Sequence, residues 1–165
     1  MSGIAMNVIG NVRTERAYTY YKWQITATKG TPTPYDGYLQ AAEFVFQYAG
    51  IDQTATTDSA TVTNPGGSNP VGEEPPKLVD NNLTTKCVDL NFTTNGSVSI
   101  FVFQFSSPKL FNGYRWATAN DFEARDPKSW TLAGSNDGTT WTTLSTVSNF
   151  TATSTRETWQ TSQSY

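Results

Sequence analysis

The chain has 165 residues, of which 36% are hydrophobic and 13% aromatic, and its formal net charge is -3 at pH 7. This length is enough for one domain with a buried core. The Lys and Arg residues form no cluster, so we expect no nucleic acid partner, because binding to nucleic acid depends on concentrated positive charge.

The sequence contains one cysteine, Cys87, and no histidine. An intrachain disulfide is therefore impossible, and the commonest general base and transition-metal ligand is missing. Residues 1–12 lack the basic and apolar pattern of a secretory signal, so no secretion signal is expected. No apolar stretch approaches the roughly 20 residues of a membrane span, so we expect no membrane insertion.

The first half of the chain begins with residues 1–16, which show no clear period and are predicted to form an N-terminal arm. Residues 17–28 (AYTYYKWQITAT) are rich in aromatic and β-branched side chains and predict a strand. Residues 38–48 (YLQAAEFVFQY) combine alanines, which favour a helix, with an apolar run that favours a buried strand. We interpret this segment as a strand.

Residues 52–77 are polar and rich in Thr, Pro, Gly and Ser. Such a stretch could be a flexible linker between two domains. It could also be a long surface loop with one short edge strand near residues 60–63. We favour the loop, because residues 17–48 alone are too few to form a core. The prediction is therefore a single domain over residues 17–165.

The second half of the chain consists of short apolar runs separated by turn residues. Residues 78–89 are predicted to form a compact loop. The predicted strands that follow are 98–105, 113–118, 129–133, 140–146 and 157–161. Asp137-Gly138 between two of them predicts a hairpin, because Gly tolerates the positive φ of tight turns. Short strands without helical periodicity predict an all-β fold, an antiparallel β-sandwich.

Three motifs together resemble a known family. They are LVDNNLTTKC at 78–87, YRWATANDFEARDPKSWTLAGSNDGTTW at 114–141, and YYKWQITATKG with YLQAAEFVF between residues 20 and 46. They resemble the discoidin-like β-sandwich, also called coagulation-factor type C or galactose-binding-domain-like, and cover most of residues 17–161. The resemblance implies a jelly-roll-like sandwich that binds ligands or surfaces and does not catalyse.

The order of these motifs differs from that of the usual family member, because the closing strands come first and the central strands last. This order implies a circular permutation, with the cut between residues 157–161 and residues 17–28. Since a permuted domain needs neighbouring ends, we expect Thr161 and Ala17 to lie close together. Permuted copies of this kind resemble modules of phage tail and virion proteins, which implies a location in a virion.

The family resemblance also implies a calcium ion at the 78–87 motif, held by Asp80, Asn82, Thr85 and Glu43. Calcium takes six to eight oxygen ligands, which such residues and nearby carbonyl groups supply. Asn81 and Cys87 replace the usual Gly and Trp of the motif. The alternative is a metal-free loop that is closed by its own hydrogen bonds.

Candidates for ligand contact come from the predicted loops. Arg125 could orient a sugar through bidentate hydrogen bonds, or it could pair with an acidic neighbour and fix the loop before Pro127. Tyr35, Tyr38 and Phe122 lie in or beside loops, where an exposed aromatic face could contact a glycan.

Other residues that could attract attention are expected to be structural. Trp130 and Trp141 alternate with polar neighbours and are predicted to lie in the core. Cys87 has no histidine to activate it and is expected to be a small buried residue. Nothing in the spacing of Glu73, Glu74 and Glu123 places two carboxylates across a cleft. We therefore expect no enzymatic activity.

Two functions remain. The first is a non-enzymatic virion structural protein, either a capsid-decoration subunit or one associated with the tail or fibre. Residues 1–16 and 52–77 would then contact other virion proteins or copies of the chain. The second is a carbohydrate-binding module for cell-surface glycans. We favour the first, because of the permuted order and the two irregular segments.

Overall fold

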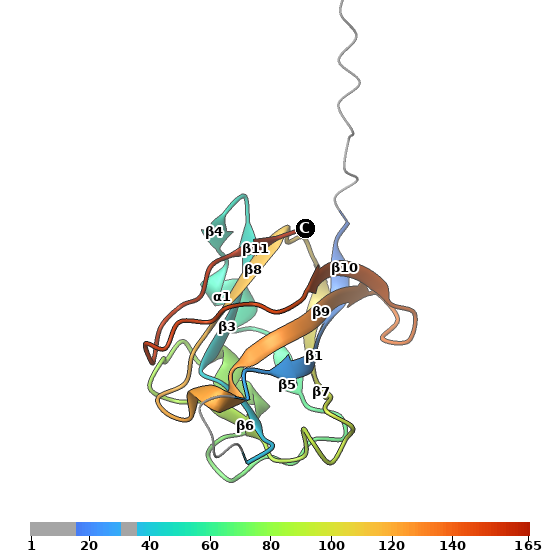
Figure 1. Ribbon diagram of the computed structural model, residues 1–165. Coiled ribbons are helices and arrows are strands. Elements are labelled where there is room, and N and C mark those ends of the chain that lie inside the picture. Colours follow the sequence, from blue (N-terminus) through green and yellow to red (C-terminus); the bar gives the residue numbers. More distant parts are fainter. Residues whose placement is uncertain (1–15, 31–35) are drawn as a thin grey trace, which may run out of the picture.

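The computed structural model describes residues 16–30 and 36–165 and shows an all-β sandwich-like fold (Figure 1). Within these residues the strands form three sheets with antiparallel pairing. The five-stranded sheet has the order β10 (Thr142–Val147), β9 (Pro127–Ser135), β1 (Tyr18–Thr28), β7 (Ser99–Lys109) and β5 (Thr61–Thr63). The four-stranded sheet has the order β11 (Gln163–Ser164), β8 (Gly113–Ala117), β3 (Glu43–Tyr48) and β4 (Ile51–Asp52). The two-stranded sheet joins β2 (Leu39–Ala41) and β6 (Cys87–Asp89). The predicted fold class is confirmed.

The core is aromatic and follows from the period of two along the strands. Tyr21, Trp23 and Ile25 of β1 are fully buried, because alternate residues of a strand point to the same face. On the adjacent β7, Phe101, Phe103 and Phe105 are buried in the same alternation. Such rings bury large apolar areas, which compensates for the modest hydrophobic fraction of the chain.

Tryptophan residues join the two large sheets. The rings of Trp23, Trp116 and Trp130 lie with centroids 6.1 to 6.4 Å apart. Trp130 is 1% exposed, as predicted. The prediction for Trp141 was wrong, because its side chain is only partly buried and lies under Nζ of Lys22, 4.5 Å from the ring centroid. Lys22 lies between Tyr21 and Trp23 in β1 and so points away from the core.

Two predicted strands differ from the structure. The predicted strand 38–48 is divided at Ala42 into β2 and β3, which belong to different sheets. The predicted strand 157–161 makes only one bridge, between Trp159 and Ala117. Glu157 has φ of 53°, which interrupts an extended backbone.

Residues 52–77 contain more structure than the sequence suggested. The edge strand predicted near 60–63 is confirmed as β5, which pairs with β7. The segment also holds the helix α1 (Thr54–Thr57) and the beginning of the 3-10 helix η1 (Pro75–Val79). Thr57 Oγ1 donates to the carbonyl oxygen of Gln53 at 2.9 Å and accepts from Phe46 N at 3.1 Å. This side chain joins the single turn of α1 to β3.

The compact loop predicted at 78–89 is only partly a loop, because the end of η1 and all of β6 fall within it. Cys87 in β6 is fully buried, as expected, and burial raises the pKa of its thiol. Among the described residues, no helix has the length and hydropathy to cross a membrane.

Both ends of the described chain lie at the same end of the sandwich. The C-terminus lies beside the start of β1 (Figure 1), and Arg16 and Tyr165 line the same cavity. The two ends of the described chain are therefore neighbours, which agrees with the expectation that Ala17 and Thr161 lie close together. The permutation itself stays a prediction.

Candidate functional site

The 80–85 loop lies against the first residue of β3. Glu43 begins β3 and is 2% exposed, and its Oε1 accepts a 2.7 Å hydrogen bond from Asn82 N. Thr85 Oγ1 lies 2.9 Å from both carboxylate oxygens of Asp80. Asn81 has φ of 53°, a left-handed conformation that Asn tolerates. All four residues predicted for calcium therefore meet at this loop.

The carboxyl groups in this loop strongly affect one another. Burial, together with the carboxylates of Asp80 and Asp58, raises the pKa of Glu43 to about 8, although the hydrogen bond from Asn82 N opposes this. Burial also opposes ionisation of Asp80, but hydrogen bonds from Glu43, Thr85 and Lys77 lower its pKa. A proton on Glu43, shared with Asp80, therefore relieves the repulsion between two nearby negative charges.

The oxygen atoms that this loop presents are of the types that bind calcium. Two carboxylates, a hydroxyl group and nearby amide and carbonyl oxygens are the ligands that calcium prefers. However, within residues 16–30 and 36–165 no three Asp, Glu or Cys side chains are grouped so as to hold a metal ion. The Asp80 oxygens already accept from Thr85 and from Lys77 Nζ, which lies 3.2 Å away. The loop is thus closed by its own hydrogen bonds, as in the metal-free alternative.

A second candidate site lies near the other predicted loop. We call Asp36, Tyr38, Phe122 and Arg125 the Arg125 cluster. Arg125 Nη2 and Nε donate to Asp36 Oδ2 at 2.5 and 3.0 Å. The guanidinium carbon of Arg125 lies 4.1 Å from the ring centroid of Phe122 and 5.2 Å from that of Tyr38. Stacking of this kind is favourable, because the faces of aromatic rings carry negative potential.

Phe122 has an unusual backbone in this cluster. Its φ of 35° and ψ of 64° lie in the left-handed region, yet its side chain is 56% exposed. A bulky residue in this region stores about 1–3 kcal/mol of strain, which must be balanced by the surroundings. The fully buried Gln40 supplies part of that balance, because its Nε2 donates to the carbonyl oxygens of Asp121 and Phe122 at 2.5 and 3.2 Å. The fold therefore holds an aromatic ring out to solvent.

The structure brings together three of the four residues predicted to contact a ligand, namely Tyr38, Phe122 and Arg125. The fourth, Tyr35, lies outside the described residues. Arg125 also fulfils the structural alternative, because it pairs with an acidic residue, Asp36, and its Nη1 reaches Gln40 Oε1 at 3.4 Å. Burial alone would raise the pKa of Asp36, but the hydrogen bonds and the charge of Arg125 outweigh this effect and lower it.

Other charged residues of the 120–127 segment have their own partners. Asp121 pairs with Lys86, at 2.6 Å, and Asp126 pairs with Arg156. Asp36, Gln40 and Arg156 were not identified from the sequence. No local pattern marks them, because each acts on a residue that lies 30 to 89 positions away.

Comparison with models of protein families found no match, and comparisons with curated proteins and with solved structures found none either.

Proposed function

We propose that the protein is a non-enzymatic structural subunit of a virus particle, of the capsid-decoration, tail or fibre-associated kind, and that it contacts its partners through the Arg125 cluster. The supporting observation is the exposed ring of Phe122 on a left-handed backbone. Strain that a fold retains is more common at sites of recognition than on ordinary surface. The virion context comes from the resemblance of the three motifs.

The chemistry of the cluster suits contact with another macromolecule. An exposed aromatic ring beside charged groups is typical of residues that dominate binding energy at interfaces, where Tyr, Trp and Arg are enriched. Arg125 is pre-organised by Asp36 and by both aromatic rings, so little side-chain entropy is lost on binding. Partners in this proposal are other virion proteins or copies of the chain.

A direct test is detection in the particle. Antibodies against the purified protein should label virus particles from the same source, and mass spectrometry of washed particles should detect it. In a particle-assembly assay, Phe122→Ala should reduce incorporation strongly. Thr151→Ala is the control, because Thr151 is exposed and lies outside both the Arg125 cluster and the 52–77 segment. Particles that contain none of the expressed protein would contradict the proposal.

A second function, a carbohydrate-binding module, is favoured by one specific observation. The Arg125 cluster combines two aromatic rings with a guanidinium and a carboxylate, which are groups that bind sugar faces and sugar hydroxyls. On a glycan array, specific binding that is lost in Phe122→Ala and kept in Thr151→Ala would support this function. An array without any signal would count against it.

We also propose a structural calcium ion at the 80–85 loop, held by Glu43, Asp80, Asn82 and Thr85. When bound, the ion would replace the proton that Glu43 otherwise keeps, and it would neutralise the pair of carboxylates. Lys77 would then have to release Asp80.

A further inference from the structure

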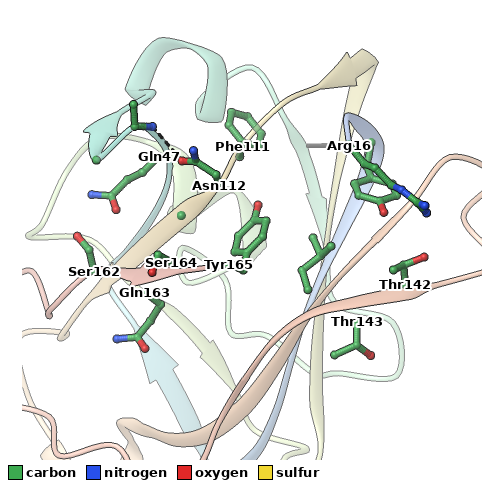
Figure 2. Close-up of a pocket in the computed structure, with 15 residues that line it drawn as sticks. Arg16, Gln47, Phe111, Asn112, Thr142, Thr143, Ser162, Gln163, Ser164 and Tyr165 are labelled. Carbon is green, nitrogen blue, oxygen red and sulfur yellow. Dashed lines mark hydrogen bonds between the residues drawn. The ribbon is translucent and has the colours of Figure 1, made fainter. Parts of the chain in front are cut away.

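A cavity of about 900 Å³ opens at the end of the sandwich that lies away from the Arg125 cluster. Tyr18, at the beginning of β1, lines it, whereas the residues after the end of β1, Lys29 and Gly30, bond to the backbone of the 124–126 segment. Figure 2 shows Tyr165 between Asn112 on one side and Thr142 and Thr143 on the other. This volume is within the range of sites that bind ligands.

The cavity lies between two strand edges. β10 is the edge strand of the five-stranded sheet, and β11 is the edge strand of the four-stranded sheet. Within the described part of the chain, β10 pairs only with β9. Its sequence, TTLSTV, has no charged residue. Proteins usually protect an edge strand with charge, proline or a cover, so an uncharged free edge beside a cavity suggests a place where another strand adds.

Two buried hydroxyl groups at the cavity, those of Tyr18 and Tyr165, have no hydrogen-bond partner among the described residues. Tyr18 lines the cavity and is 6% exposed, and its Oη makes no hydrogen bond to any described residue. Buried polar groups are nearly always satisfied in native structures. Two unsatisfied hydroxyl groups beside one cavity are therefore what a site completed by a partner would show.

The charge of the residues that line the cavity indicates the charge of the ligand. Arg16 is the one charged side chain among the described residues that line the cavity, and no Asp or Glu lies there. Arg16 takes part in no ion pair with a described residue. A ligand with a carboxylate would therefore complement this lining.

Exposed apolar residues continue the surface beyond the cavity. Ala49 and Gly50 line it and form the turn between β3 and β4. The residues that flank this turn, Tyr48 and Ile51, are 38% and 67% exposed. Exposed apolar side chains beside a cavity are typical of a surface that a protein partner covers.

We propose that the cavity between β10 and β11 binds an extended acidic peptide segment of a protein partner. The segment adds a strand to β10, places an apolar side chain in the cavity and a carboxylate at Arg16. This inference rests on the proposed assembly function, because it names the class of partner that the subunit receives. It concerns a different surface from the Arg125 cluster.

The test starts with selection from a yeast-displayed library of random peptides about ten residues long on the full-length protein. Enriched peptides should alternate apolar and polar residues and should contain Asp or Glu. A synthetic copy of the most enriched peptide is then titrated. Thr143→Trp should raise its Kd by at least about tenfold, because the exposed Thr143 lines the cavity and the new ring would fill it. Thr63→Trp is the matched control, because Thr63 is exposed on β5, the opposite edge strand of the same sheet, and does not line the cavity.

A second variant tests the sign of the charge. Selection on Arg16→Glu should enrich peptides with Lys or Arg in place of the acidic residue, whereas selection on Lys128→Glu should still enrich acidic ones. The inference is overturned if no peptide is enriched on the wild type. It is also overturned if the Kd of the selected peptide is the same in Thr143→Trp as in Thr63→Trp. Detection in particles and binding to glycans do not depend on these variants, so failure here is distinct from failure of the proposed function.

Discussion

The backbone N–H of Asn82 donates a 2.7 Å hydrogen bond to Oε1 of Glu43, which joins the 80–85 loop to the first residue of β3. These residues come from two motifs that lie 39 positions apart in the sequence. The contact buries a carboxyl group beside Asp80 and Asp58. It therefore determines how the stability of the fold responds to pH and to cations.

The first prediction concerns the pH dependence of stability. The pKa of Glu43 is about 8 in the folded state and 4.5 when unperturbed. Between these values the unfolded chain has lost the proton that the folded chain retains, so stability falls as pH rises. The decrease in unfolding free energy from pH 4.5 to 8 is at most roughly 5 kcal/mol. Glu43→Gln should remove most of this decrease, as measured by urea unfolding at several pH values. An unchanged pH profile in the variant would contradict the prediction.

The second prediction concerns calcium. A ligand that binds only the folded state raises its stability. Addition of Ca²⁺ to protein treated with EDTA should therefore raise the Tm of the wild type at pH 8. Glu43→Gln and Asp80→Asn should show no such rise. Asp52→Asn should keep it, because Asp52 pairs with Arg115 of β8 and takes no part in this loop. An identical wild-type Tm with and without Ca²⁺ would favour the metal-free loop.

The third prediction concerns the ion pair of Asp126 and Arg156. Arg156 Nη1 and Nη2 donate to the two oxygens of the fully buried Asp126 at 3.0 and 2.6 Å. Burial raises the pKa of Asp126 to about 6, although Arg156 opposes this. Arg156→Met would leave an unpaired buried carboxyl group, and we expect it to destabilise the fold by about 3–5 kcal/mol.

The matched control for this prediction is Arg115→Met. Arg115 also pairs with an aspartate, Asp52, but both side chains are more than a quarter exposed. A pair of this kind contributes about 0–1 kcal/mol. Equal losses in the two variants, measured by urea unfolding, would show that burial of Asp126 is not the decisive difference.

The longest strands were the easiest to predict, because their burial alternates over many residues. β1 and β7 each have 11 residues with regular inward positions, so their pattern is unambiguous. α1 has only 4 residues, which is too short for a period to appear. The break at Ala42 depends on a tertiary contact, because its N–H donates to the carbonyl oxygen of Ala117. The positive φ of Glu157 could not be predicted from the sequence, because Glu is not a residue type that favours a left-handed backbone.

The candidate sites were predictable only in part. Tyr38, Phe122 and Arg125 were identified individually, because aromatic and charged residues in loops are natural candidates. Their arrangement in one cluster depends on the buried Gln40, and no sequence pattern around Gln40 indicates this role. The cavity could not be predicted, because it depends on the separation of β10 from β11. That separation is a property of how the sheets pack.

The last prediction concerns a chain of hydrogen bonds between the sheets. Trp130 Nε1 donates to Tyr114 Oη at 2.8 Å, and Tyr114 Oη donates to Ser145 Oγ at 3.1 Å. Tyr114→Phe would leave the buried indole N–H without an acceptor, which costs about 1–3 kcal/mol. Tyr20→Phe removes an exposed hydroxyl that accepts from Gln104, and it should change stability by less than about 0.5 kcal/mol. Urea unfolding of both variants measures the difference. Similar small losses in the two variants would mean that Trp130 finds another acceptor.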